Sequence, residues 1–326
     1  MTAYLIRRVL GLVPLFVGIT VLCFVVIHLA PGNPVTGGAE LNPKISVEAQ
    51  RRIIELYRLN DPLPVQYARW VKAVITLNFG RSLTDNRPVI QKIAERIPIT
   101  LTINVLSMVL IILLALPIGV LAAAKPQGLF DQTTTLLVFL GFSTPTFWLA
   151  LLLMRGLGVQ LQWLPVSGIH SLGAEQWPWW ERGWDMARHL VLPVGVSAFG
   201  GLAGFARYMR GSMVEVLRQD YIRTARAKGL PERFVLFRHA MRNALLPVIT
   251  LLGLSVPGLL GGSVIFETIF SIPGLGRLYY EAVMARDLTT VMGLLTISAV
   301  LTLLGNLLAD LAYAYADPRI RVGEAR

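Results

Sequence analysis

The stretch Ile97-Pro-Ile-Thr-Leu-Thr-Ile-Asn-Val-Leu-Ser-Met-Val-Leu-Ile-Ile-Leu-Leu-Ala-Leu-Pro-Ile-Gly-Val-Leu-Ala-Ala-Ala124 decides the fold of this 326-residue chain. It contains no aspartate, glutamate, lysine or arginine, and it is longer than the roughly 20 apolar residues that a helix needs to cross a bilayer. It also lacks the period-two alternation of a barrel strand, the other structure that satisfies its own backbone in lipid. We therefore expect a transmembrane helix here.

Five more windows reach or approach this length without a charged side chain: Val9–Ala39, Gln132–Met154, His189–Ala206, Asn243–Phe266 and Leu288–Ala309. Only 15% of all residues are charged, against about 25% in a typical soluble domain. The first window is too long for a secretory signal, and Ala30-Pro-Gly-Asn-Pro34 is a poor cleavage site. The sequence predicts an all-α polytopic membrane protein with about six transmembrane helices: the first in residues 1–30, an extracytoplasmic segment over 31–96, and a core of five helices over 97–326.

The distribution of positive charge predicts the orientation in the membrane. Residues 207–242 carry nine lysines and arginines but only three acidic residues, which is typical of a cytoplasmic loop. Six spans then place both termini in the cytoplasm. The segment 31–96 holds ten basic and six acidic residues and argues the other way, but the positive-inside rule holds poorly for long loops.

Aromatic residues gather in the two predicted external segments. Ser46 has the character of a helix N-cap, and Val65–Leu77 predicts a short helix with one apolar side formed by Tyr67, Trp70, Val71 and Val74. These helices either pack as a cap on the bundle or dock an external partner. The second external loop contains five tryptophans that indicate an interfacial belt, with substrate stacking as the alternative: Trp163, Trp177, Trp179, Trp180 and Trp184.

The basic loop over 207–244 predicts two short helices. Asp220 suits the start of the first, and Gly229 can end it with a positive φ. Pro231 and Glu232 then suit the first turn of a second helix, because proline and acidic residues are favoured at a helix N-terminus. By itself this loop could be a surface bend or bind anionic lipid.

Two runs in this loop, Arg223-Thr-Ala-Arg-Ala-Lys-Gly229 and Arg242-Asn-Ala-Leu-Leu-Pro247, resemble the coupling loop of ABC-importer permeases. The chain is most similar to the B-type membrane subunit of the dipeptide, oligopeptide and nickel branch. The resemblance covers nearly the whole chain through motifs in the same order and spacing: Leu29-Ala-Pro-Gly-Asn-Pro34, Leu59-Asn-Asp-Pro-Leu-Pro-Val-Gln-Tyr67, Asn78-Phe-Gly-Arg-Ser82, Ser143-Thr-Pro-Thr-Phe-Trp148, Glu267-Thr-Ile-Phe-Ser-Ile-Pro-Gly-Leu-Gly-Arg277, Arg286-Asp287 and Asp317-Pro-Arg-Ile-Arg321. The wider family often has an acidic residue and two alanines where this chain has Arg223-Thr224-Ala225.

The resemblance implies a type I importer fold, a location in the bacterial cytoplasmic (inner) membrane and several partners. These are a second, C-type permease subunit, two ABC ATPase subunits that bind ATP and Mg²⁺, and an extracytoplasmic peptide-binding protein, besides membrane lipid. It implies no cofactor in this chain, no nucleic-acid partner and a cargo of dipeptides or oligopeptides. Related permeases carry glutathione or nickel complexes, which remain alternatives.

The resemblance also assigns candidate residues by function. Eight residues of the coupling loop are expected to contact the ATPase: Tyr221, Arg223, Ala225, Arg226, Lys228, Gly229, Pro231 and Phe234. Five residues are expected to form an outer gate, although this segment could also simply reverse the chain: Glu267, Phe270, Pro273, Gly274 and Gly276. Four polar or helix-breaking residues in the spans are candidates for the pathway, with helix–helix contact as the alternative: Asn104, Ser143, Thr144 and Pro145.

Other functional classes find little support in the sequence. No P-loop is present, because no lysine follows a glycine, so we expect no ATP hydrolysis by this chain. An ion-coupled carrier would need a buried proton relay, for which only His28, His189 and Asp310 qualify. No set of residues predicts a metal site or a catalytic triad, and the single cysteine, Cys23, is expected to pack in the first helix.

Overall fold

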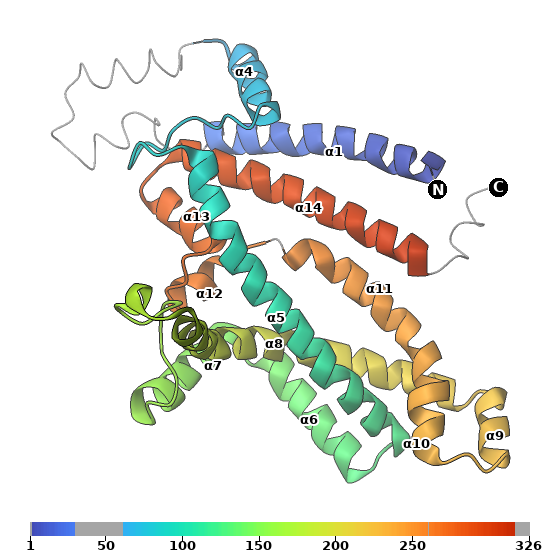
Figure 1. Cartoon of the computed structure of the whole chain (residues 1–326). Coiled ribbons are helices and arrows are strands. Elements are labelled where there is room, and N and C mark those ends of the chain that lie inside the picture. The colour runs from blue at the N-terminus through green and yellow to red at the C-terminus, as the bar shows by residue number, and fades with distance from the viewer. Residues whose placement is uncertain (1, 30–60, 260, 317–326) are drawn as a thin grey trace.

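The computed structural model describes residues 2–29, 61–259 and 261–316, and these are almost entirely helical (Figure 1). Within the described ranges there is no strand, only an isolated bridge between Arg81 and Pro88. The predicted all-α class is therefore confirmed. The helix start expected at Ser46 lies outside the described residues.

Two long helices, α5 (Val89–Ala124) and α8 (Trp179–Leu217), pack against each other along much of their length. They cross closely because α5 has a glycine at the contact: a Cβ on Gly119 would lie 2.6 Å from the Cβ of Met209. Pro98 and Pro117 lie inside α5, as membrane helices tolerate when neighbouring helices support the backbone. Since α5 begins at Val89, it runs without a break across the boundary expected at residue 96.

The window Gln132–Met154 is not one straight helix, which corrects the sequence-based expectation. It forms α6 (Leu129–Ser143) and α7 (Thr146–Leu153), which continues as the π-helix η1 (Met154–Gln160). The two arms meet at an angle of 100°. The reason is Pro145, which disfavours the helical conformation of the residue before it, and Thr144 is accordingly extended with φ −90° and ψ 117°.

The C-terminal half adds two further long helices. The short α10 (Glu232–Phe234), the π-helix η3 (Val235–Ala240) and α11 (Met241–Leu259) follow one another as one continuous helical run over Glu232–Leu259, which contains an apolar window of spanning length. The last helix, α14 (Leu288–Ala316), packs on α11 and on α1 (Thr2–Leu29). Shorter helices join them: α9 (Asp220–Ala227), α12 (Val264–Ile269), α13 (Leu275–Met284) and the 3₁₀ turn η2 (Ala174–Gln176).

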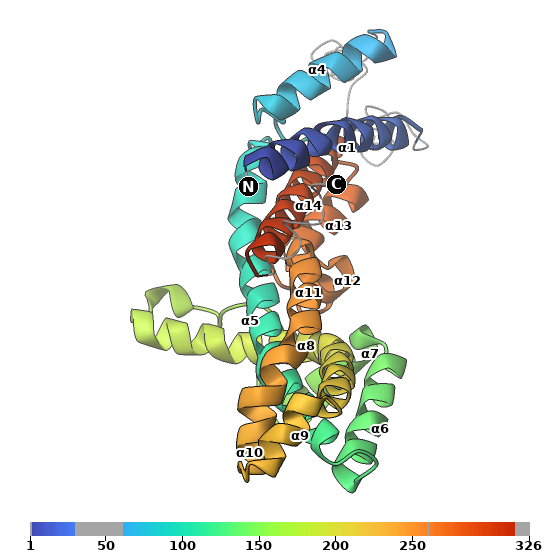
Figure 2. The ribbon, with the colours of Figure 1, turned by 90° about the vertical axis from the view of Figure 1, so that its right-hand side faces the viewer.

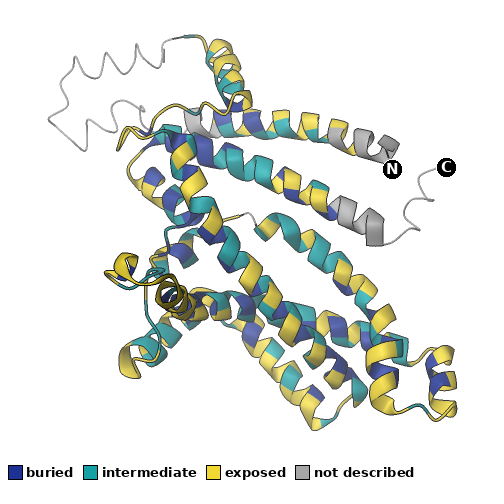
Figure 3. Cartoon of the chain, in the orientation of Figure 1, coloured by how far each residue is buried: buried dark blue, intermediate teal, exposed yellow. Residues whose placement is uncertain are grey.

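Within the part of the chain that the structure describes, four helices are long and apolar enough to cross a membrane: α5, α8, the run Glu232–Leu259 and α14. The bent pair α6 and α7–η1 makes a fifth if it is a single span. In α1 the apolar part within the described side chains is Leu10–Val25, shorter than the roughly 20 residues of a full span. A sixth span therefore stays a prediction. The apolar outer faces of these helices are exposed, most clearly along α6 (Figure 3).

The predicted helix near Val65–Leu77 is confirmed as α4 (Leu63–Ile75). Its apolar side packs on α1 through an aromatic cluster, in which the rings of Tyr67 and Trp70 lie 5.4 and 5.9 Å from that of Phe24. The hydroxyl groups of Thr20 and Tyr67 are hydrogen-bonded at 3.0 Å. Helix α4 therefore contacts the bundle through α1.

The ends of the helices separate in Figure 1, and Figure 2 views the molecule from the right-hand side of that picture. The start of α1, the end of α14 and α9 lie toward the right in Figure 1, and the α5–α6 turn lies at the bottom. The loop after η1, α12 and α13 lie toward the left. Which of these ends face the cytoplasm stays a prediction.

Candidate functional site

The α9–α10 turn is held against the rest of the chain by the apolar side chains on its inner side. Ile222 and Ala225 point inward and pack in a cluster with Met213 of α8 and Val235 of η3. Ala225 is thus buried in the chain's own core. Of the eight expected coupling residues, Ala225 is the one that is buried, and the other seven are exposed.

The outward side of this turn carries aromatic and basic side chains. Tyr221, Arg223, Lys228 and Phe234 are exposed. The hydroxyl of Tyr221 accepts a hydrogen bond of 2.7 Å from Asn243, which ties α9 to the start of α11. The ring of Phe234 lies under the guanidinium of Arg238, 5.2 Å from its centroid, a cation–π distance. These contacts hold the exposed groups in fixed positions.

Gly229 sets the angle between the two helices. Its φ is +76°, a conformation that side-chain-bearing L-residues rarely adopt, as the sequence predicted. Arg226 and Glu232 brace the same turn from opposite sides through two hydrogen bonds of 3.1 and 2.6 Å. These bonds raise the pKa of Arg226 above its usual value. Pro231 stands at the N-cap of α10, one position before its expected place in the first turn.

The opposite end of the bundle is organised around a buried carboxylate, Glu267, whose residue is only 3% exposed. It accepts hydrogen bonds from the hydroxyl of Thr100 at 3.0 Å and from the backbone N–H of Arg277 at 2.9 Å. The Thr100 hydroxyl in turn accepts from Leu275 N–H. Burial raises the pKa of Glu267 despite these hydrogen bonds. The carboxylate therefore joins α5, α12 and the first turn of α13.

The two glycines of this segment allow the close approach. A Cβ on Gly274 would lie 2.4 Å from a carboxylate oxygen of Glu267, and one on Gly276 would lie 2.5 Å from the backbone of Ser263. Phe270 is almost fully buried, and its carbonyl accepts from Gly168 N–H of the second external loop. Pro273 lines a cavity of about 390 Å³ between this segment and α5. The five expected gate residues are thus brought together.

The expected pathway residues are separated in the structure. Asn104 donates to the carbonyls of Leu259 and Gly261, so it connects α5 to the end of α11. Ser143, Thr144 and Pro145 lie at the bend between α6 and α7. The Thr144 hydroxyl donates to Leu140 in its own helix. Asn104 therefore makes a contact between helices, and Ser143, Thr144 and Pro145 form the end of one helix and the start of the next.

A charge pair between the buried Asp131 of α6 and the partly exposed Arg210 of α8 was not predicted from the sequence. Asp131 is 3% exposed and accepts two hydrogen bonds from Arg210, of which the Nη2–Oδ2 bond is 2.6 Å, and a third from Gln127 N–H. The pair fixes the α5–α6 turn to α8. The sequence did carry a signal for this pair. Asp131 stands alone directly before the charge-free window Gln132–Met154, and a carboxylate at the edge of a membrane helix needs a partner.

A second missed feature is the environment of Asp287, which is 1% exposed. It accepts from the Ser82 hydroxyl at 2.5 Å, from Leu83 N–H at 3.1 Å and from the Thr290 hydroxyl at 2.7 Å. Burial alone would raise the pKa of Asp287, but these hydrogen bonds outweigh it and lower the pKa. Two of the quoted motifs, Asn78–Ser82 and Arg286-Asp287, are therefore in contact.

The structure offers little for the rival classes. Among the described residues, no three His, Cys, Asp or Glu side chains are grouped as a metal site would require. The relay candidate His189 is bonded within its own turn, with its Nδ1 2.8 Å from the Asp185 carbonyl. The side chains of His28 and Asp310 lie outside the described residues.

Apolar helices of spanning length, with the buried carboxylates Asp131 and Glu267 both hydrogen-bonded, define a polytopic membrane protein. Sequence comparison gives the family. Residues 115–322 match the family described as binding-protein-dependent transport system inner membrane component, and residues 1–104 match the N-terminal family of these membrane components. The chain belongs to this family, whose members are membrane permeases of ABC importers and not catalytic enzymes.

Several curated relatives match over nearly their full length. The oligopeptide transport system permease protein AppB of Bacillus subtilis is 44% identical over 98% of this chain and 99% of the relative. The dipeptide transport system permease protein DppB of Escherichia coli is 38% identical over 98% and 99%. DppB of Alkalihalophilus pseudofirmus is 36% identical over 98% and 100%.

Proposed function

We propose that this chain is the B-type membrane subunit of an ATP-driven importer of dipeptides or oligopeptides. It would form one part of the translocation path and couple that path to partner ATPases. The similarity to peptide permeases over nearly the whole chain supports the cargo class. Glutathione and nickel complexes are alternatives that the cargo test below separates.

The observation that carries the coupling role is the α9–α10 turn. Its exposed side chains at this end of the bundle are Tyr221, Arg223, Lys228 and Phe234. The opposite side of α9 is packed into the core through Ile222 and Ala225. Aromatic and arginine side chains are the groups that most often anchor protein interfaces. Closure of the ATPase pair on ATP would push this helix, and the firm packing of Ile222 and Ala225 would pass the movement to α8 and η3.

The segment around Glu267 is the proposed outer gate. Its short helices are attached to α5 through Thr100, so a tilt of α5 would carry them along. The buried carboxylate gives this contact two discrete states, bonded or broken, which suits a switch of access. Selection of the cargo would rest with the extracytoplasmic binding protein.

Co-purification tests the assembly. A tagged chain, extracted mildly from its own membrane, should bring down a second permease and one or two P-loop ATPases. Recovery of the chain alone, with solute transport that needs a proton gradient and no ATP, would replace the proposal with the carrier class.

A charge reversal tests the coupling surface. Arg223→Glu should lower ATPase recovery and peptide uptake by about tenfold, since a misplaced charge at an interface weakens association by this order. Arg182→Glu makes the same charge change in the first turns of α8, near the external loop, and should leave both readouts unchanged. Equal effects of the two variants would show that α9 is not the coupling surface.

Uptake of labelled dipeptides and pentapeptides, with and without excess glutathione or a chelated nickel complex, tests the cargo. Competition by peptides alone supports the proposal. Uptake of glutathione or nickel without peptide uptake would assign the chain to one of the alternative cargoes.

A further inference from the structure

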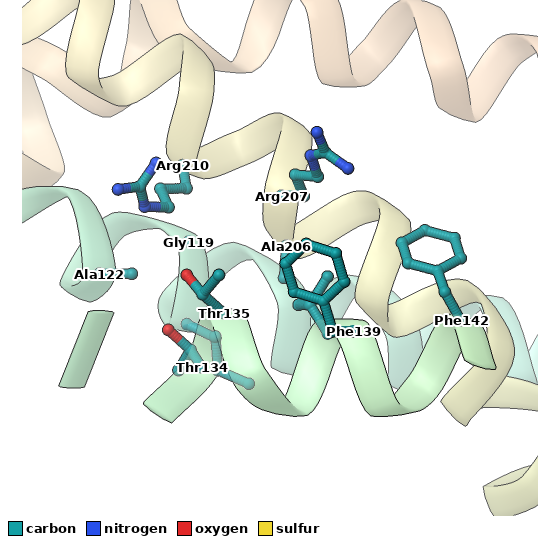
Figure 4. Close-up of a pocket in the computed structure, with 11 residues that line it drawn as sticks. Gly119, Ala122, Thr134, Thr135, Phe139, Phe142, Ala206, Arg207 and Arg210 are labelled. Carbon is teal, nitrogen blue, oxygen red and sulfur yellow. The ribbon is translucent and has the colours of Figure 1, made fainter. Parts of the chain in front are cut away.

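A cavity of about 260 Å³ lies between α5, α6 and α8, beside the Asp131–Arg210 pair (Figure 4). It lies toward the same end of the bundle as the α9–α10 turn, close to the α5–α6 turn. Its walls are formed by residues of these three helices that belong to neither the coupling surface nor the gate: Ile118, Gly119, Ala122, Thr134, Thr135, Val138, Phe139, Phe142, Ala206, Arg207 and Arg210.

The walls of the cavity change from polar to apolar along α6. Thr134 and Thr135 lie near the start of this helix, and Phe142 lies two turns further, about 12 Å deeper at 1.5 Å per residue. The Thr135 side chain points toward Gly119 of α5 across the cavity (Figure 4). Along α6 the threonines stand at one end of the cavity and Phe142 at the other, and the Arg207 side chain of α8 lies beside Phe139 (Figure 4). A charged group and an apolar wall are therefore both within reach of an amphiphile.

Only one of the two arginines that line the cavity is paired with a carboxylate. Arg210 is neutralised by Asp131. Arg207 lies one turn away on the same helix and is exposed, and no carboxylate pairs with it among the residues that the structure describes. A cation without a counter-charge in an otherwise apolar segment favours an anion beside it, which the bilayer supplies as lipid phosphate.

The outer wall of the cavity continues into an apolar face. Over residues 136–142 of α6, five large side chains are each at least half exposed: Leu136, Leu137, Phe139, Leu140 and Phe142. Such a face is unfavourable in water and suits an acyl chain in a membrane. A lipid whose headgroup reached Arg207 would have its chains along this face.

We propose that this cavity binds the headgroup of an anionic phospholipid of the leaflet on the α9–α10 side, with Arg207 as the phosphate ligand and the Thr135 hydroxyl as a second donor. The acyl chains would lie against Phe139 and Phe142. The lipid would join α6 to α8 next to the pair that fixes the α5–α6 turn. The inference depends on the membrane location of the chain and is independent of its cargo.

The test uses the chain co-expressed with its partner subunits and purified in mild detergent. Native mass spectrometry with added phosphatidylglycerol or phosphatidylcholine should show tighter binding of the anionic lipid. Arg207→Gln should weaken phosphatidylglycerol binding by about fivefold, the order expected for one basic residue at a membrane surface. Arg207→Lys should retain most of the affinity, and phosphatidylcholine binding should be the same in all variants.

Two further variants separate a defined site from general attraction. Arg218→Gln removes an exposed arginine from the C-cap of the same helix, outside the cavity, and should leave lipid binding unchanged. Thr135→Trp fills the cavity from an exposed position without changing charge, and it should also displace phosphatidylglycerol. Equal losses in Arg207→Gln and Arg218→Gln, or no loss in Thr135→Trp, would overturn the proposal. So would crosslinks from Phe139→Cys to the second permease, because a protein would then cover this face.

Discussion

Gly229 shows how one residue determines the shape of the α9–α10 turn. Nothing lies within 4 Å of where its Cβ would be, so space is not the constraint. The constraint is φ +76°, which places a Cβ against the chain's own carbonyl. A side chain at this position is disfavoured by backbone conformation alone.

Gly229→Ala should therefore destabilise the turn by about 1–2 kcal/mol and lower ATP-coupled uptake. Hydrogen exchange over residues 220–235 would measure the loosening. Gly211→Ala is the matched control, because Gly211 lies within helix α8 with no atom near its Cβ position. That control should be neutral or slightly stabilising. Unchanged exchange in Gly229→Ala would contradict the role of the positive φ.

Glu267 makes a pH-dependent contribution to stability with an unusual sign for a carboxylate. Burial raises its folded-state pKa above the ordinary value of about 4.3, so the folded state binds this proton more tightly than the unfolded state does. Its contribution to stability is full below the ordinary pKa and is lost as the pH rises through the raised pKa.

We expect Glu267→Gln to remove this part of the pH dependence. Thermal unfolding of the purified protein, followed from pH 4 to 8, should show a smaller decline with rising pH in the variant than in the wild type. Glu281→Gln, at an exposed site on the neighbouring α13, should keep the wild-type slope. An identical slope for Glu267→Gln and the wild type would show that this carboxylate titrates normally.

At the scale of elements, buried carboxylates fix the turns onto the long helices. The Asp131–Arg210 pair joins the α5–α6 turn to α8, and Asp287 joins residues 81–83 to the start of α14. Each carboxylate is nearly inaccessible to solvent and has at least three donors. Removing a hydrogen-bond donor from a buried carboxylate of this kind lowers the stability of the folded protein, because the charge is then left unsatisfied.

Asp131→Asn should lower stability by about 2 kcal/mol, within the range for hydrogen bonds to charged groups and below that of a fully buried ion pair because Arg210 is partly exposed. A double-mutant cycle with Arg210→Gln measures the coupling: the double variant should be less damaging than the sum of the two single changes. Additive effects would show that the two side chains act independently.

At the scale of the whole molecule, the α9–α10 turn and the second external loop should face opposite sides of the membrane. The single cysteine makes this testable: in a Cys23→Ala background, Leu172→Cys and Arg218→Cys place one thiol at each end of the bundle. A membrane-impermeant maleimide should label Leu172→Cys in intact cells and Arg218→Cys only after permeabilisation. The reverse pattern would invert the proposed orientation.

Much of the fold and part of the candidate site could be predicted from the sequence. The turn at Gly229 followed from local residue types, and α4 from a short apolar period. The bend at Thr144 was missed although its proline was visible, because membrane helices often contain proline without bending sharply, as α5 does at Pro117.

The sequence by itself determined the membrane class and the position of most helices, because hydrophobicity, charge-free length and capping are properties of neighbouring residues. Only the tertiary structure decided that Ala225 faces the chain's own core, that Asp131 meets Arg210, and that Ser82 meets Asp287 across 205 positions. These facts depend on which distant helices pack together. A pattern of local residue types does not contain that information, because the burial of each side chain is set by partners far away in the chain.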